Sequence, residues 1–321
     1  MLKTSVRGLH YRLPQLGSVK SAERGLPGLF SPATVSQLWF DRSQQVLSRL
    51  NRALEDTAST TKDDMPLPEL IEDTMKHAGH RDVNVHATLL YNSQFFFDSL
   101  RPQPDQPVKK APYAALFETP TVEFTNQPTE PSLVKWINDS FGSVTELRTL
   151  LLNSAQAING DGYAWLVAVP QVKMGTGATT YSELAVMNTY GAGYVDDAVR
   201  GERLDKMAMA RAQVEAERRQ KQAERKQQNE FDDDVVAPVP ESLSEGDRRQ
   251  LGTQHEAESA IGAFAGRRVL PLVALDASPR AYLGDYGVFG KHHYLKNAWE
   301  CIDWDVVASR APVRVSTAVM H

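Results

Sequence analysis

The sequence predicts an α+β fold with a helical front and a small sheet behind it. Two long segments in the N-terminal half carry apolar residues at helical spacing, and three short apolar runs follow in the C-terminal half. Because helices and strands are segregated along the chain, we expect them to form separate layers around one core.

Composition bounds the class of protein. The 321 residues are 41% apolar and 23% charged, and no apolar run approaches the roughly 18 residues of a membrane-spanning helix. The single Cys301 and the lack of a CxxC pair argue against a disulfide scaffold and a thiolate zinc site. With 35 basic and 40 acidic residues the net charge is −5, so any RNA contact must be local.

The first helix is predicted to begin at Ser31, which serves as N-cap, with Pro32 at the first helical position. Its apolar face comprises Val35, Leu38, Val46, Leu50 and Leu54. A second helix is predicted over 84–100, with a common face of Val85, Leu89, Ser93, Phe96 and Leu100. We expect the two helices to pair as a hairpin.

The connecting segments suggest the domain boundaries. Residues 56–83 are polar and are expected to be irregular, and the prolines of 101–131 forbid a continuous helix. We place the boundary near residue 125. The predicted parts are an N-terminal tail over 1–22, a helical hairpin domain over 23–124, and a C-terminal domain over 125–321.

The C-terminal domain is predicted to begin with a helix capped by Ser143, in a capping box with Glu146. Apolar runs at 160–169, 183–191 and 267–276 are predicted strands. The chain closes with YLKNAWECIDWDVV, which is expected to form a short helix and its return.

Two charged segments stand apart from this layout. The first 22 residues are basic and resemble a short mitochondrial presequence, the alternative being an ordinary basic tail. Residues 195–266 are predicted to be an insertion, with a charged helix over 201–230 and an acidic linker after it. The insertion is either a solvated helix and loop or a docking arm for protein or RNA.

Four stretches together resemble the iron/manganese superoxide dismutase family. They are SPATVSQLWFDRSQQVLSRLN, NSQFFFDSL, FGSVTELRTLL with GDGYAWLV, and PLVALDASPRAYLGDYG, followed by an aromatic tail ending in IDWDVV. The resemblance covers roughly 14–196 and 267–310. It implies an N-terminal α-helical hairpin followed by a C-terminal domain with a three-stranded antiparallel sheet and helices.

The same resemblance implies that the metal site is degenerate. The family holds its metal with three histidines and one aspartate, and the matching positions are Leu38, Ser93, Asp276 and Arg280. Leucine donates no lone pair, a serine hydroxyl replaces imidazole poorly, and arginine is a permanent cation. Only the aspartate remains, so we expect no metal, no cofactor and no catalytic residue.

Further family positions are also altered. The two alternative glutamine positions are Ala192 and Leu89, the gateway tyrosine is Val46, and the adjacent histidine is Arg42. These side chains cannot form a proton relay. The positions of the family's dimer contact are Pro279, Arg280 and Leu283, which favours a different, similarly degenerate partner over self-pairing.

A buried carboxylate needs a counter-charge. Ser278 and Pro279 predict a helix start that places Arg280 one turn from Asp276. We therefore predict an Asp276–Arg280 ion pair in the former metal cavity, with Leu38 filling space. The alternative is a surface pair of little energetic value.

Other residues give weaker signals. The spacing of His77, His80 and His86 lacks a fourth zinc ligand, and His292 and His293 are interpreted as exposed histidines beside Lys291. GTGATT lacks the pattern of a phosphate-binding loop. The aromatic run FFF fits a helix core better than a base-stacking platform.

A dismutase fold without its metal site and with a presequence-like N-terminus resembles the dismutase-like proteins of the fungal mitochondrial small ribosomal subunit. The leading hypothesis is a structural ribosomal protein of the mitochondrial matrix, not an enzyme. Its expected partners are a paralogous dismutase-fold chain, neighbouring ribosomal proteins and a limited stretch of ribosomal RNA. The alternatives are an active dismutase with displaced ligands and a free matrix binding protein.

Overall fold

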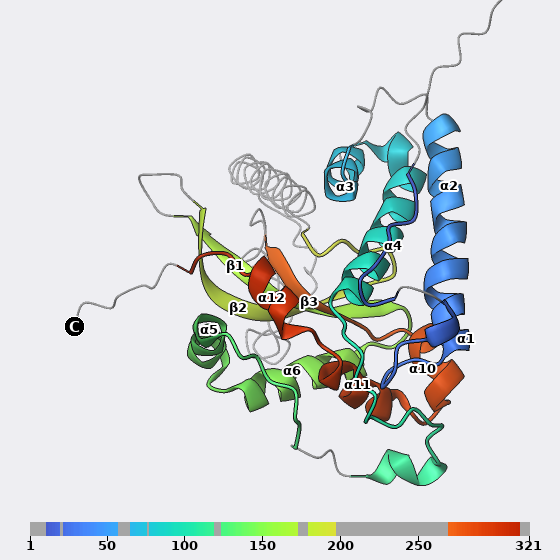
Figure 1. Cartoon of the computed structure of the whole chain (residues 1–321). Coiled ribbons are helices and arrows are strands. Elements are labelled where there is room, and N and C mark those ends of the chain that lie inside the picture. Colours follow the sequence, from blue (N-terminus) through green and yellow to red (C-terminus); the bar gives the residue numbers. More distant parts are fainter. Residues whose placement is uncertain are drawn as a thin grey trace, which may run out of the picture. The chain divides into compact units, whose positions relative to one another are not determined.

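The front of the molecule is a helical hairpin next to a small sheet (Figure 1). The computed structural model describes residues 11–19, 22–56, 65–75, 77–118, 123–172, 179–196 and 269–314, which fall in one compact unit of the chain. The expected insertion lies outside the described residues except for its first two positions. Most of the presequence-like stretch and of GTGATT also lies outside them.

The first arm of the hairpin begins where the sequence predicts, after the short 3-10 turn η1 (Ala22–Arg24). Ser31 caps α1 (Pro32–Val35) by accepting a hydrogen bond from the Thr34 backbone N–H. The helix then widens into a π-helical stretch, η2 (Ser36–Asp41), and continues as α2 (Arg42–Asp56). The whole predicted apolar stripe is buried.

The second arm is α4 (Arg81–Asp98), which packs along α2 as the predicted hairpin. Ser93, Phe96 and Leu100 of the predicted face are buried, but toward the start of the helix the buried face is turned from the predicted one. Val83, Ala87 and Leu90 are buried, whereas Val85 and Leu89 are half-buried. The reason is a third helix on the hairpin, which covers the face that carries Val83 and Ala87.

That third helix is α3 (Leu67–Met75), followed by the 3-10 turn η3 (Ala78–His80). The expectation of an irregular segment over 56–83 is therefore wrong for this part. Leu70, Ile71 and Thr74 are buried, at the spacing of one helix face, and the helix packs against α4. The short apolar stripe is masked in the sequence by the polar residues around it.

Part of the expected tail belongs to the folded core. Leu16 and Val19 are buried, and Ser18 donates a hydrogen bond of 2.7 Å to the Phe97 carbonyl. The backbone of Tyr11 exchanges hydrogen bonds with the Asn51 side chain. The described residues 11–19 thus tie the N-terminal segment to both arms of the hairpin.

The proline-bearing segment contains only a short 3-10 helix, η4 (Tyr113–Phe117), in its described part. The helix α5 (Pro131–Phe141) was not predicted from the sequence. Its N-cap is Glu130, whose side chain accepts hydrogen bonds from the Ser132 and Leu133 N–H groups. The predicted cap at Ser143 is confirmed, since its hydroxyl accepts from the Glu146 N–H at the start of α6 (Val144–Ala157).

The sheet confirms the predicted α+β class. Its strands are β1 (Gly162–Val172), β2 (Thr179–Tyr190) and β3 (Leu270–Asp276), in the antiparallel order β2-β1-β3. The central strand, β1, is buried from Tyr163 through Val169. The helix α4 packs on β3, and both α5 and α6 pack on β2. The chain then forms α10 (Pro279–Tyr286), α11 (Lys291–Glu300) and α12 (Trp304–Arg310).

None of the helices in the described ranges combines the length and apolar character needed to cross a membrane. The longest of them, α4, has both polar and apolar faces.

Candidate functional site

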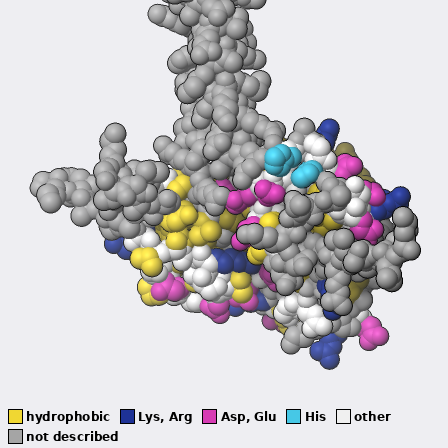
Figure 2. All heavy atoms as spheres, turned by 90° about the horizontal axis from the view of Figure 1, so that it is seen from above, with side chains coloured by type: hydrophobic (Ala, Val, Ile, Leu, Met, Phe, Trp, Pro, Cys, Tyr) yellow, Lys and Arg dark blue, Asp and Glu magenta, His cyan; other side chains and the backbone are white. Residues whose placement is uncertain are grey.

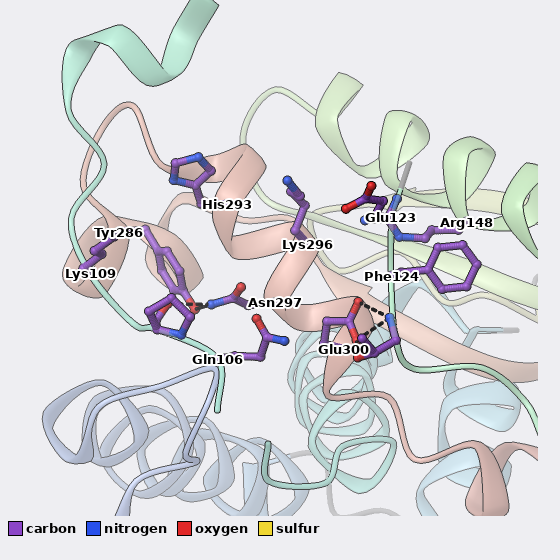
Figure 3. Close-up of a pocket in the computed structure, with 12 residues that line it drawn as sticks. Gln106, Lys109, Glu123, Phe124, Arg148, Tyr286, His293, Lys296, Asn297 and Glu300 are labelled. Atoms are coloured by element: carbon purple, nitrogen blue, oxygen red, sulfur yellow. Dashed lines mark hydrogen bonds between the residues drawn. The ribbon is translucent and has the colours of Figure 1, made fainter. Parts of the chain in front are cut away.

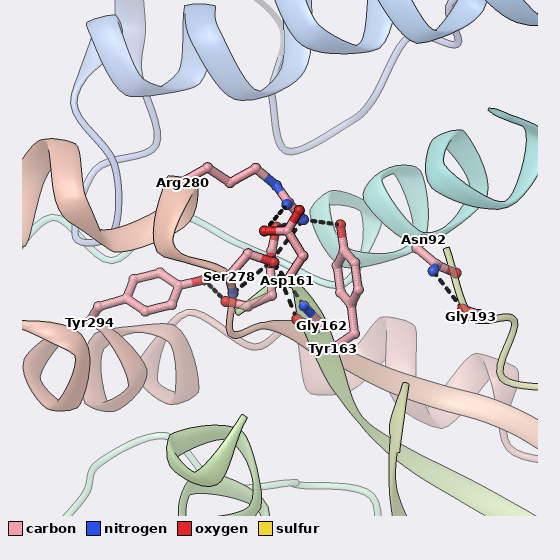
Figure 4. Close-up of polar contacts among 9 residues, drawn as sticks. Asn92, Asp161, Gly162, Tyr163, Gly193, Ser278, Arg280 and Tyr294 are labelled. Carbon is pink, nitrogen blue, oxygen red and sulfur yellow. Dashed lines mark hydrogen bonds and ion pairs between the residues drawn. The ribbon is translucent and has the colours of Figure 1, made fainter. Parts of the chain in front are cut away.

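The surviving aspartate of the family's metal site is paired with a cation. An Arg280 Nη atom lies 3.2 Å from Asp276 Oδ2 and 3.3 Å from its Oδ1 (Figure 4). The Asp276 side chain is 6% exposed and that of Arg280 is 20% exposed, so this is not a surface pair. The predicted ion pair is therefore confirmed.

The turn between β3 and α10 holds this pair in place. Ser278 and Pro279 occupy the N-cap and first helical positions, as predicted, and the Ser278 N–H donates to Asp276 Oδ1 at 3.0 Å. The Ser278 hydroxyl does not cap the helix. It accepts a hydrogen bond from the Gly162 N–H at 3.1 Å and so ties α10 to the start of β1.

Asp161, just before β1, and Tyr163 of β1 complete the surroundings of Arg280. A second Nη atom lies 2.8 Å from Asp161 Oδ1, and Arg280 also donates to the Tyr163 hydroxyl at 3.4 Å. Burial alone would lower the pKa of the Arg280 guanidinium, but the Asp276 carboxylate, Tyr163 and Asp161 raise it above its usual value. Arg280 is thus fixed as a cation between two carboxylates.

Tyr163 is fully buried in this cluster. Its burial, and next the charge of Asp276, raise its pKa well above that of a free tyrosine. The hydroxyl therefore stays protonated at neutral pH. A second tyrosine, Tyr294, donates to the Asp276 carbonyl at 2.7 Å, and burial raises its pKa as well.

The other two ligand positions lie in the core. Leu38 is 7% exposed and belongs to the same apolar cluster as Tyr163 and Tyr294, and Ser93 of α4 is 4% exposed. Leu38 lies within the π-helical stretch η2. Such stretches are rare and frequently mark functional sites in helices.

Of the remaining positions named from the family resemblance, only Arg42 has a described link to the cluster. Arg42 is near enough to act electrostatically on Tyr163. Val46 is buried, Leu89 is half-buried, and Ala192 lies in the turn after β2. The adjacent Gly193 carbonyl accepts a hydrogen bond of 2.9 Å from Asn92 of α4 (Figure 4).

This donor set does not fit an iron or manganese ion. A redox metal in this fold needs neutral imidazoles beside the carboxylate, whereas here a guanidinium occupies both oxygens of Asp276. Within the described ranges, no group of three or more His, Cys, Asp and Glu side chains is arranged to hold a metal ion. We therefore derive no chemical step through a metal.

The two histidine clusters lie elsewhere. His77 is exposed and its ring centroid is 5.3 Å from that of His80, while His86 contacts the Asp82 carbonyl in its own helix. On the surface drawn in Figure 2, histidine side chains (cyan) lie close to acidic ones (magenta). His292 and His293 are half-buried, which corrects the expectation that they are exposed. His293 contacts Glu118 at 2.9 Å.

A cavity of about 380 Å³ lies beside α11, away from the Arg280 cluster (Figure 3). Its walls come from α6, α10, α11 and the segment 106–125. The charged side chains that line it are Lys109, Glu123, Arg148, His293, Lys296 and Glu300. Glu300 is 6% exposed and accepts hydrogen bonds from the Thr125 hydroxyl at 2.7 Å and the Asn126 N–H at 2.9 Å.

Sequence reasoning found Asp276 and Arg280 but missed Asp161 and Tyr163. The register between β1 and β3 is the feature that brings Asp161 and Tyr163 to the site. In the antiparallel pairing of β1 with β3, Tyr163 lies opposite Asp276, and Asp161 comes just before the strand. The cavity beside α11 had no comparable signal, because its walls come from segments more than 100 residues apart.

Comparison with known proteins agrees with this geometry. Residues 128–192 and 243–310 match the model of the iron/manganese superoxide dismutase C-terminal domain. The chain is 22% identical over 290 residues to small ribosomal subunit protein mS43 of Schizosaccharomyces pombe, covering 90% of this chain and 81% of that protein. It is 22% identical over 225 residues to small ribosomal subunit protein mS42 of the same organism, covering 70% of this chain and 64% of that protein. The C-terminal part of this chain is thus similar to the iron/manganese superoxide dismutase C-terminal domain.

Proposed function

We propose that this chain is a structural constituent of the mitochondrial small ribosomal subunit, built on a dismutase fold without a metal site. The observation that carries the proposal is the Arg280 guanidinium on Asp276, where the family places a metal ligand beside the metal. Similarity to two small ribosomal subunit proteins supports the ribosomal assignment. The presequence-like N-terminus supports the mitochondrial matrix as its location.

The site supports a structural role better than catalysis. Leu38 and Ser93 cannot replace imidazole, Arg280 repels a cation, and Tyr163 does not ionise near neutral pH. The same contacts have a clear structural effect. Arg280 joins α10 to β3 and to Asp161 just before β1, so it ties together three neighbouring segments of the C-terminal domain.

The partner we propose is a second, paralogous dismutase-fold chain. Arg280 is occupied within its own chain, so it is not available for the contact that the family makes across its dimer. Leu283, at another position of that contact, is 42% exposed on α10. An exposed leucine on this face suits an interface with an apolar centre. Neighbouring ribosomal proteins and a short stretch of ribosomal RNA would contact the remaining surface.

Sedimentation tests the ribosomal assignment. In a sucrose gradient of mitochondrial lysate the chain should travel with the small subunit, and it should stay with that subunit after low magnesium separates the two subunits. A folded chain found only at the top of the gradient would be a free matrix protein and would contradict the proposal.

Restoring the ligands tests the assignment of the vacated site. The triple variant Leu38→His, Ser93→His, Arg280→His places three imidazoles beside Asp276 in this fold. We expect the triple variant to bind manganese or iron measurably by metal analysis, and the unmodified chain to bind neither in stoichiometric amounts. Stoichiometric metal in the unmodified chain, with dismutation of superoxide, would instead establish an enzyme with displaced ligands.

Leu283→Asp tests the partner. Coexpressed with its paralogue, the unmodified chain should elute as a heterodimer in size-exclusion chromatography with light scattering, and the variant should dissociate. Leu150→Asp is a matched control, because Leu150 is 47% exposed on α6 rather than on α10. Equal dissociation of both variants, or a stable homodimer, would count against the proposed face.

A further inference from the structure

An exposed apolar patch lies on η4 and the loop between α10 and α11. It consists of Tyr113, Leu116, Phe117, Val288 and Phe289, which we call the apolar patch. Tyr113, Leu116, Phe117 and Val288 are 62%, 55%, 74% and 69% exposed. The Tyr113 ring packs edge-on against Phe117 and Phe289, with centroids 5.5 and 5.3 Å apart. Large side chains gathered in this way usually mark an interaction site.

The patch is held firmly to the core. Ala115 of η4 is buried, and the Ala111 N–H donates to the Tyr286 carbonyl at 2.9 Å just before the helix. On the other side, Glu118 contacts His293 of α11 at 2.9 Å. The exposed rings are thus presented on an ordered support, which lowers the entropic cost of binding a partner.

The cavity beside α11 opens next to the patch and carries positive charge. Lys109 and Lys296 line it, and neither has an ion-pair partner among the described residues. Burial, and then the charges of Lys296, His293 and Arg148, lower the pKa of His292. The Glu300 carboxylate faces backbone and hydroxyl donors of Thr125 and Asn126, and the cations Lys109, Arg148 and Lys296 outnumber the carboxylates Glu123 and Glu300 in the lining.

We propose that the apolar patch and this cavity form one docking surface for a protein segment that presents apolar side chains followed by a carboxylate. The apolar side chains would cover Phe117 and Val288. The carboxylate would enter the cavity between Lys109 and Lys296. Charge complementarity between that carboxylate and the two lysines fixes the direction in which the segment lies.

The composition of the surface favours protein over RNA. Leu116 and Val288 offer no flat face for a base, and the best-exposed rings are packed edge-on against each other. Aromatic and aliphatic anchors beside a charged pocket are typical of protein interfaces. The inference deepens the proposed function, since an assembly supplies the protein neighbour.

Site-specific photocrosslinking tests the docking surface. The full chain is expressed in mitochondria with p-benzoylphenylalanine in place of Phe117, and the adduct is identified by mass spectrometry. We expect one protein adduct, on a segment with apolar residues and an Asp or Glu close by in sequence. The same group in place of Val313, which is 91% exposed outside the patch, is the positional control and should not give this adduct.

Charge reversal provides the second arm. Lys109→Glu with Lys296→Glu should reduce the adduct roughly fivefold or more. The matched control, Lys135→Glu with Arg52→Glu, changes the net charge equally at exposed positions outside the cavity and should leave the yield unchanged. Equal melting temperatures of the variants establish that each is folded.

Three results would overturn the inference: an adduct on RNA, no adduct at residue 117, or a yield insensitive to charge reversal in the cavity. The gradient position of the chain is measured on the same lysate. A chain that leaves the small subunit but keeps its adduct contradicts the proposed function alone. A chain that sediments with the subunit and has no adduct contradicts the docking surface alone.

Discussion

Two buried carboxyl groups of the C-terminal domain have hydrogen-bond partners of different kinds. Asp276 ends β3 and is 4% exposed, and Glu300 ends α11 and is 6% exposed. Asp276 has a guanidinium within hydrogen-bond distance. Glu300 instead accepts from Thr125 and Asn126, which are neutral donors of one loop.

The difference follows from what each carboxylate connects. Asp276 lies at the end of β3, and a cation with several donors can bridge it and Asp161, which precedes β1, at once. Glu300 fastens a single loop onto one helix, for which backbone N–H groups suffice. A carboxylate where several segments meet is thus paired with a multidentate cation, whereas a carboxylate that holds one loop is satisfied by neutral donors.

Removing the cation should have the largest effect. Arg280→Leu leaves Asp276 buried without its counter-charge and is expected to lower the free energy of unfolding by about 3 kcal/mol. The double variant Asp276→Asn, Arg280→Leu should recover more than half of that loss, because no charge is then left unpaired. Denaturant unfolding of both variants measures the difference. Equal losses would mean that Arg280 acts by packing and not as a counter-ion.

The loop carboxylate should be less costly to replace. Glu300→Ala is expected to cost about 2 kcal/mol, since the N–H groups of Thr125 and Asn126 lose their acceptor. Glu300→Gln keeps one acceptor and should cost about 1 kcal/mol. Hydrogen exchange at Asn126 should accelerate in both variants. If Glu300→Gln were as damaging as Arg280→Leu, the distinction between the two carboxylates would fail.

The fold was largely predictable because its signals are local. Ser31 and Ser143 cap helices where the sequence places them, and the three strands are apolar runs with clear ends. The helix α3 was missed because its apolar stripe is only three turns long and lies among polar residues. A short stripe becomes decisive only when a neighbouring helix is present to bury it.

Only the part of the candidate site that depends on residues close together in sequence could be predicted. The pairing of Asp276 with Arg280 follows from one helical turn of sequence, so it could be foreseen. The contact between Arg280 and Asp161 depends on strand register across more than 100 residues. The docking surface depends on how η4 sits beside α11, which no local pattern encodes.

The hydroxyls of Ser143 and Ser278 both accept a hydrogen bond from a backbone N–H, but in different surroundings. Ser143 is a helix cap at the surface, whereas the Ser278 hydroxyl is buried and accepts from Gly162 across the sheet. Ser278→Ala should cost about 1.5 kcal/mol, because a buried N–H loses its acceptor. Ser143→Gly should cost only a few tenths of a kcal/mol, since glycine is tolerated at N-caps. Thermal unfolding compares the two, and equal costs would contradict this assignment of Ser278.

The smallest expected effect concerns pH and distinguishes the electrostatics of the two regions. Burial, and next the cations Lys296, His293 and Arg148, lower the pKa of His292 in the folded state. As the pH falls through the unfolded-state value of about 6.5, the unfolded chain therefore binds a proton that the folded chain does not. The free energy of unfolding should decrease over this window, and His292→Gln should remove part of the decrease. Denaturant curves between pH 8 and pH 5.5 measure it. Parallel curves for the two proteins would show that the pKa of His292 is not lowered in the folded state, whereas convergence at low pH would confirm that folding disfavours its protonation.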